Sequence, residues 1–152
     1  MATIKRRTTV FVGADAAWRL WTDLSRWPAF VEGFKHVERQ SGEFPEEGAR
    51  IQWASIPGGR GAVSERVVAS ERPHRLVTQV FEEAMAATQA VSFRAAEETD
   101  GTWVEFELEY RLTQAGVLKQ ITDVLFIRRA LAAAIDRTLR RFAREAEEEA
   151  AL

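Results

Sequence analysis

Three polar residues, Glu65, Tyr110 and Arg128, fall at positions that the sequence pattern places inside the protein. A carboxylate can accept a proton, and a guanidinium or a phenol can stabilise the oxyanion of an enolate, a phenolate or a carboxylate. Burying an arginine is costly unless it is paired or opens onto solvent. Glu65 is therefore the predicted partner of Arg128, in an aqueous or ligand-filled cavity.

The placement of these residues depends on the period of their neighbours. Glu65 shares one face of a predicted strand with Val63 and Val67. Arg128 falls near the middle of the apolar arc of the last helix when residues are phased at about 100° each. A kink or phase slip near Phe126 would instead return Arg128 to the surface and leave Glu65 partly exposed.

The only tyrosine ends an inward stripe on the last predicted strand. There Val104, Phe106, Leu108 and Tyr110 alternate with charged residues, and such a period of two is typical of a half-buried strand. A buried phenol needs a hydrogen-bond partner, which Thr78, a backbone group, water or a ligand could supply.

Other familiar catalytic patterns are missing. The chain has no cysteine and two histidines, which excludes disulfides, thiolate metal sites and cysteine nucleophiles. His36 and His74 fall near strand ends or turns, where surface roles are the simpler interpretation. No metal-ligand spacing and no glycine-rich phosphate loop is present. We expect neither a metal nor a cofactor.

The order of the elements places the polar residues between a sheet and a helix. Two short tryptophan-rich helices follow the first strand, with Asp15 and Ser25 as predicted N-caps. Asp100-Gly101 is a hairpin signal before the last strand, and a long amphipathic helix begins near Ala115. The strands are predicted at 4–12, 34–41, 49–56, 62–70, 75–82, 88–96 and about 104–111.

Length and charge narrow the class of protein. A chain of 152 residues suits one domain, 1–152. With 21 basic and 23 acidic residues, nothing favours nucleic acid as a partner. The apolar run at Val10–Val12 is too short for a signal peptide or a membrane span, so we expect a cytoplasmic protein without stable membrane insertion. Phe11 and Trp103 lie on predicted outward faces and could mark a homodimer contact.

Several of these residues together resemble a known family. Trp18, Asp23, the run Arg26-Trp27-Pro28-Ala29-Phe30 and Tyr110 are similar to motifs of the START-like polyketide cyclase and dehydrase superfamily, which includes the coenzyme Q-binding group. The resemblance implies an α+β helix-grip fold, in which a seven-stranded antiparallel sheet wraps around the C-terminal helix. It also implies a hydrophobic small-molecule ligand. The family has no universal catalytic residues, so it transfers none to this chain.

The leading hypothesis is a cavity between sheet and helix that binds a lipid, a quinone or an aromatic polyketide-like molecule. One alternative is a polyketide cyclase or dehydratase that uses Glu65, Tyr110 and Arg128 in the same cavity. Another is a protein-interaction module that uses the outer sheet face around Trp103. The predicted ligand-binding residues are Trp27, Phe30, Trp53, Glu65, Val67, Thr78, Val91, Phe93, Phe106, Leu108, Tyr110, Arg128, Ile135 and Leu139.

Overall fold

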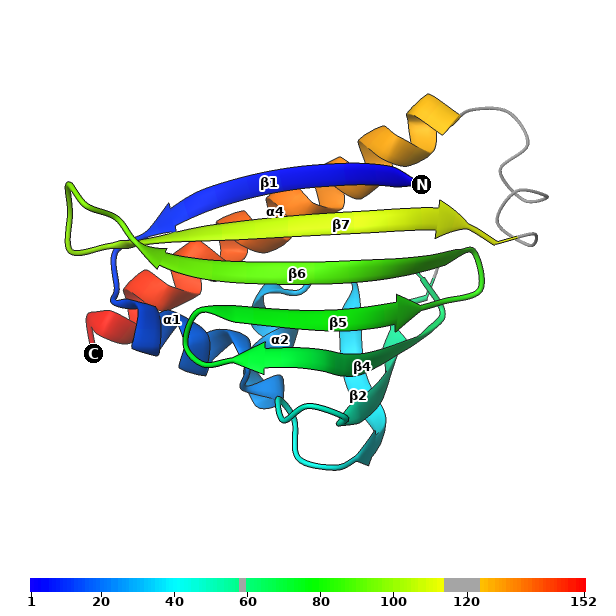
Figure 1. Cartoon of the computed structure of the whole chain (residues 1–152), viewed down its shortest axis with the longest axis horizontal. Coiled ribbons are helices and arrows are strands. Elements are labelled where there is room, and N and C mark those ends of the chain that lie inside the picture. The colour runs from blue at the N-terminus through cyan, green and yellow to red at the C-terminus, as the bar shows by residue number, and fades with distance from the viewer. Residues whose placement is uncertain (58–59, 114–123) are drawn as a thin grey trace.

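The computed structural model describes residues 1–57, 60–113 and 124–152 (Figure 1). Over these residues, a seven-stranded antiparallel sheet has the order β1-β7-β6-β5-β4-β3-β2. Its strands are β1 (Ala2–Val10), β2 (Phe34–Ser41), β3 (Arg50–Ser55), β4 (Ala62–Glu71), β5 (Arg75–Phe81), β6 (Met85–Ala95) and β7 (Thr102–Leu112). The helices are α1 (Ala14–Trp21), the 3-10 helix η1 (Leu24–Arg26), α2 (Trp27–Phe30) and α4 (Val124–Ala150).

The helices all lie on one side of the sheet. In Figure 1, α4 runs behind β1 and β7, and α1 and α2 lie beside its C-terminal half. The inward stripe of β7 is buried as predicted, from Val104 to Tyr110. Burying one face of a sheet beneath a helix leaves room between the two layers where side chains do not meet. The predicted helix-grip fold is confirmed.

The strand boundaries follow the predicted pattern with small shifts. The first strand ends at Val10 rather than Val12, and the sixth begins at Met85 rather than Thr88. The hairpin signal at Asp100-Gly101 lies between β6 and β7, as expected. At Gly101 the backbone carbonyl oxygen of Val10 would lie 2.6 Å from an added Cβ, so this turn packs against the end of β1 too closely for a side chain.

Two helix caps differ from the prediction. Gly13 is the N-cap of α1, so Asp15 lies inside the first turn, where its charge still interacts favourably with the helix N-terminus. Ser25 does not cap the next helix. Asp23 caps η1 by accepting a 3.1 Å hydrogen bond from the backbone amide of Ser25, because its carboxylate reaches the amide two residues ahead. Pro28 occupies the first turn of α2 as predicted.

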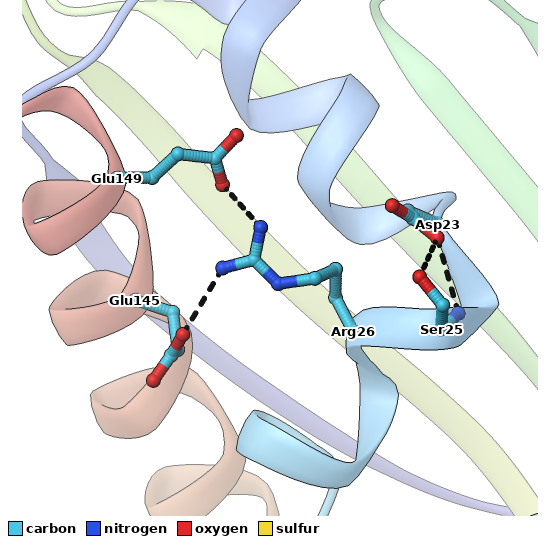
Figure 2. Close-up of polar contacts among 5 residues, drawn as sticks. All are labelled: Asp23, Ser25, Arg26, Glu145 and Glu149. Carbon is cyan, nitrogen blue, oxygen red and sulfur yellow. Dashed lines mark hydrogen bonds and ion pairs between the residues drawn. The ribbon is translucent and has the colours of Figure 1, made fainter. Parts of the chain in front are cut away.

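A single arginine connects the short helices to the end of α4. Figure 2 shows Arg26 extending from η1 to two carboxylates on successive turns of α4. Its guanidinium donates to Glu149 at 2.8 Å and to Glu145 at 3.2 Å. The pKa of Arg26 is raised, chiefly by its hydrogen bonds to Glu149 and Glu145. This contact holds the acidic end of α4 against the segment that closes one end of the molecule.

An aromatic cluster fills the interior beneath α1 and α2. The ring of Trp21 lies 5.1 Å from that of Phe142, 5.4 Å from that of Phe30 and 6.4 Å from that of Phe93, measured between centroids. Trp18 packs edge-on against Phe93. Edge-to-face rings of this kind add to the free energy gained by burying them. This end of the molecule is therefore solid core.

Of the two placements of Arg128 that the sequence left open, the structure has the one on the surface, so Arg128 is not a residue of the predicted cavity. Arg128 is exposed, although Ala132 and Ile135 farther along α4 are buried. The neighbouring Leu125 and Phe126 are 53% and 63% exposed, so the helix face that is buried at Ala132 is open to solvent one turn earlier. In Figure 1 the first described turns of α4 lie beyond β1, the edge strand of the sheet. The predicted start of this helix, near Ala115, lies outside the described residues.

Candidate ligand-binding cavity

A cavity of about 550 Å³ lies between the sheet and α4, and Trp21 of the aromatic cluster forms part of its lining. Its aromatic wall consists of Trp21, Trp27, Trp53, Phe106 and Phe126. A second apolar wall comes from one stripe of α4, formed by Ile127, Ala130, Leu131, Ala134 and Ile135. This volume lies within the range usual for small-molecule sites, and such walls exclude water from a bound ligand.

One buried carboxyl group lies in the wall of the cavity. Glu65 on β4 is 6% exposed and lines the cavity. Its Oε2 accepts a 2.7 Å hydrogen bond from the indole nitrogen of Trp53, and its Oε1 accepts one at 3.2 Å from the hydroxyl of Thr78. Burial raises the pKa of Glu65, because desolvation outweighs these two hydrogen bonds and the nearby charge of Arg60.

Two further charged residues line the cavity beside Glu65. Arg60 donates its Nε hydrogen to the carboxylate of Glu82. Its guanidinium carbon also lies 5.3 Å from the ring centroid of Trp53, within the range of a cation–π interaction. The same indole therefore contacts Glu65 through its N–H and Arg60 through its face. Together these groups make a polar end in an otherwise apolar cavity.

A second polar group closes the rim of the cavity near α2. Glu32 accepts a 3.0 Å hydrogen bond from Arg137 and another from Arg141, both on α4. The backbone amide of Glu32 donates to the hydroxyl of Thr138 at 3.0 Å. Glu32, Arg137 and Thr138 line the cavity, so this group ties the segment after α2 to the helix.

Some predicted site residues line the cavity and others do not. Those in the lining are Trp27, Trp53, Glu65, Phe106, Leu108 and Ile135. Those that are buried elsewhere are Phe30, Val67, Thr78, Val91, Phe93, Tyr110 and Leu139. Thr78 contacts the site only through its hydrogen bond to Glu65. Arg128 is exposed and absent from the lining, so Arg128 and Glu65 do not share the cavity.

The limits of strand alternation and helical phase explain why some predicted site residues line the cavity and others do not. Alternation and phase identify which residues point inward, but not whether an inward side chain meets the aromatic cluster or the cavity. Phe30 and Phe93 belong to the cluster. On α4, Ile127, Leu131 and Ala134 line the cavity, whereas Leu139 does not. One broad apolar arc of the helix thus covers two environments.

Arg60 and Glu82 are site residues that the pattern did not reveal. Arg60 precedes β4 and Glu82 follows β5, so both resemble ordinary loop charges. The signal that could have found them is strand pairing: β4 and β5 are antiparallel neighbours, with Ser64 opposite Phe81. The residues before β4 therefore lie beside those after β5.

The outer face of the sheet also carries a hollow, of about 540 Å³. It lies over β2 to β5, and its lining includes Arg39, Arg50, Arg66 and Phe81. Trp103, around which an interaction surface was a predicted alternative, lies instead on β7. Its ring is half-buried and is covered by Arg7, whose guanidinium carbon lies 4.6 Å from the ring centroid.

Two kinds of feature are absent from the described residues. No helix there combines the length and apolarity that crossing a membrane requires. No group of three histidine, cysteine, aspartate or glutamate side chains is arranged there to hold a metal ion.

Sequence comparison identifies a family. The model of the family described as polyketide cyclase/dehydrase and lipid transport matches residues 1–147, in agreement with the resemblance of the individual motifs. No curated protein sequence matches the chain.

Solved structures share the fold at low sequence identity. A protein from Rhizobium leguminosarum is 13% identical with a TM-score of 0.74, over 97% of this chain and 95% of its own. A protein from Deinococcus radiodurans is 22% identical with a TM-score of 0.63, over 97% and 99%. Norcoclaurine synthase from Thalictrum flavum, in complex with dopamine and hydroxybenzaldehyde, is 18% identical with a TM-score of 0.67, over 97% and 87%. At these identities the likeness shows the fold alone.

Proposed function

Because the chain belongs to the polyketide cyclase/dehydrase and lipid transport family, we propose that it binds a hydrophobic small molecule in the cavity between the sheet and α4. The observation that carries the proposal is the cavity of about 550 Å³, with aromatic and aliphatic walls and one polar end. Lipids, quinones and aromatic polyketides all have the chemistry that such a cavity takes.

The energetics favour a ligand that is mostly apolar. Each square ångström of apolar surface removed from water contributes about 25 cal/mol, so a ligand that buries about 200 Å² gains roughly 5 kcal/mol before the costs of ordering it. The wall residues Leu131 and Ile135 are packed on a helix, so little side-chain freedom is lost on binding. The few polar groups then orient the ligand rather than supply most of its affinity.

A fluorescent hydrophobic probe tests this proposal. N-phenyl-1-naphthylamine is neutral and becomes bright in apolar surroundings, and we expect saturable binding to one site. Ala134 lines the cavity, so Ala134→Phe should fill part of it and weaken binding at least tenfold. The matched control is Ala150→Phe, which makes the same substitution at an exposed position of the same helix. Equal binding by both variants would contradict the proposal.

Glu65 gives a specific reason to keep an enzymatic function as the second candidate. Burial raises the pKa of Glu65, and a buried carboxyl group with a raised pKa can act as a general acid. In the dehydration of a β-hydroxy ketone, a solvent water takes a proton from the carbon beside the carbonyl, and the hydroxyl leaves with a proton from Glu65. A double bond forms as water is released, and the Glu65 carboxylate regains a proton from solvent. Arg60 would stabilise the enolate in place of the exposed Arg128.

The dehydratase activity can be tested with a simple substrate. We expect 4-hydroxy-4-phenylbutan-2-one to lose water faster with the protein than in buffer, and Glu65→Gln to abolish the difference because an amide cannot donate a proton to the leaving group. Tight binding of hydrophobic probes without any turnover would leave carriage or sensing as the function.

The cellular setting forms part of the same proposal. We place the protein in the cytoplasm, which suits a chain without cysteine.

A dimer contact through Phe11 and Trp103 remains a prediction. Phe11 is 64% exposed, and sedimentation of the wild type and of Phe11→Ser measures whether it joins two copies.

A further inference from the structure

We propose that the polar end of the cavity selects ligands that present a neutral carbonyl oxygen and discriminates against amines. This inference rests on the proposed ligand-binding function and names the chemistry of the ligand's polar group. It follows from which hydrogen-bond donors and acceptors of Glu65, Arg60 and Trp53 are already paired within the protein. All three residues line the cavity.

The two oxygens of Glu65 have different roles. The indole N–H of Trp53 can only donate, so Oε2, at 2.7 Å from it, must accept in either protonation state. A proton held by the carboxyl group therefore sits on Oε1. The hydroxyl of Thr78 lies 3.2 Å from this same atom, which is longer than a usual O–H···O bond. When Oε1 carries the proton, its O–H can donate either to this hydroxyl or to the oxygen of a ligand. Glu65 thus offers a hydrogen bond to a ligand.

Arg60 offers donors to the same space. A guanidinium has five N–H groups, and the contacts of Arg60 with the described residues use only its Nε, which binds Glu82. Its two terminal nitrogens have no partner among those residues. Trp53 contacts both groups, Arg60 through its ring face and Glu65 through its N–H, and both Arg60 and Glu65 line this end of the cavity. A single carbonyl oxygen, with two lone pairs, can accept from both.

The charges explain the discrimination against amines. Arg60 and Glu82 form an ion pair, and Glu32 and Arg137 form another at the rim. These are the charged groups that line the cavity besides Glu65, so the cavity is close to neutral while Glu65 holds its proton. An ammonium group would add a positive charge beside Arg60 and would find donors where it needs acceptors.

Three ligands of one shape test the inference. 2-Acetylnaphthalene carries a ketone, 2-isopropylnaphthalene replaces its oxygen with a methyl group, and 1-(2-naphthyl)ethylamine replaces it with an ammonium. By calorimetry at pH 6, we expect the ketone to bind about fivefold tighter than the hydrocarbon, as one or two net hydrogen bonds imply. The amine should bind more weakly than the hydrocarbon. Equal affinities, or an amine that binds tightest, would overturn the inference.

Two substitutions of Glu65 test whether the ketone preference needs any hydrogen-bond donor at this position or a carboxyl group in particular. Glu65→Gln should keep the preference for the ketone, because its oxygen can accept from Trp53 and its amide nitrogen then donates in place of Oε1. Glu65→Leu should reduce the preference, measured within that variant as the ratio of its affinities for the ketone and for 2-isopropylnaphthalene, to less than twofold. Retention of the ketone preference by Glu65→Leu would overturn the role of this residue.

The pH dependence of the ketone preference distinguishes a hydrogen bond from Glu65 to the ligand from a purely structural role of Glu65, because a structural role would not change the preference with pH. The wild type should lose the part of its ketone preference that Glu65 provides as pH rises and Glu65 ionises, whereas Glu65→Gln should retain its full preference. Arg60→Gln should weaken ketone binding at every pH. The control is Arg50→Gln, which lies outside the cavity, and should behave as the wild type does. A preference that is independent of pH in the wild type would overturn the assignment of the donor to Glu65.

Failure of the proposed function gives a different result. If the cavity binds no hydrophobic ligand, the hydrocarbon itself fails to bind, and the inference falls with the function. If 2-isopropylnaphthalene binds and the ketone gains nothing, the function stands and only the inference is overturned.

Discussion

The indole nitrogen of Trp53 lies 2.7 Å from Oε2 of Glu65, and the two side chains come from neighbouring strands of the sheet, β3 and β4. The tryptophan gives the carboxyl group one hydrogen bond, and Thr78 gives it a second. Two donors do not replace the hydration that a carboxylate loses on burial. Burial therefore raises the pKa of Glu65 inside a cavity built mostly from hydrocarbon.

Glu65 should make the stability of the protein fall as pH rises. Its pKa is raised in the folded state, so between its ordinary value and this raised value the folded protein binds more protons than the unfolded chain. The free energy of unfolding then decreases with pH, by at most about 1.4 kcal/mol per unit for one proton. At pH values below this window Glu65 does not change the free energy of unfolding, and above the window the decrease that it causes no longer changes with pH.

Urea denaturation at several pH values measures this effect. Glu65→Gln should remove the decline, so that the variant becomes more stable than the wild type at the alkaline end. Glu109→Gln, an exposed substitution on β7, controls for the general effect of removing a carboxylate. Parallel curves for the wild type and Glu65→Gln would show that Glu65 ionises normally in the folded protein.

Thr78 should matter more when Glu65 is ionised. Thr78→Val keeps the shape of the side chain and removes its donor to Oε1. We expect a loss of about 1 kcal/mol when Glu65 is protonated and a larger loss at alkaline pH, because hydrogen bonds to a charged group are stronger. Thr78→Ser restores the hydroxyl and should recover the pH dependence. The same loss at every pH would mean that the contact with Glu65 is not responsible.

The clamp between Arg26 and α4 should contribute little stability and depend on salt. Arg26→Gln breaks contacts with Glu145 and Glu149 (Figure 2). Because the Arg26 side chain is 34% exposed and that of Glu149 is 52% exposed, we expect a loss of at most about 1 kcal/mol at low salt, shrinking in 1 M salt. Arg144→Gln, an exposed change on the same helix, serves as the control. A large, salt-independent loss would indicate packing instead.

The turn between β6 and β7 should not tolerate a side chain. At Gly101 an added Cβ would lie 2.6 Å from the carbonyl oxygen of Val10, so Gly101→Ala should destabilise the protein by about 1–3 kcal/mol. Gly13→Ala is the matched control, since nothing lies within 4 Å of its added Cβ, and it should change the thermal midpoint little. Equal effects of the two substitutions would contradict the close approach at Gly101.

The fold was predictable because its signals are local and repeated. The alternation from Val104 to Tyr110 describes a half-buried strand, and the turn at Asp100-Gly101 describes how β7 is reached from β6. The burial of Glu65 also follows from this pattern, because Val63 and Val67 share its face. In each case a few neighbouring residues contain the whole signal.

The site was only partly predictable because it depends on distance along the elements. Arg128 has the helical phase of Ala132, yet it is exposed, as is Leu125 on the turn before it. Arg60 and Glu82 belong to the cavity through the pairing of β4 with β5. Neither fact follows from the period of the surrounding residues, since both concern where an element ends relative to its neighbours.

The most direct test of a ligand in this cavity is an NMR measurement on protein with labelled leucine and isoleucine methyl groups, saturated with 2-acetylnaphthalene. We predict intermolecular contacts from the naphthalene protons to methyl groups of Leu108, Leu131 and Ile135, which line the cavity, and none to Leu76, which is buried outside it. Contacts confined to surface methyl groups such as those of Leu152, or no contacts at saturation, would contradict the account.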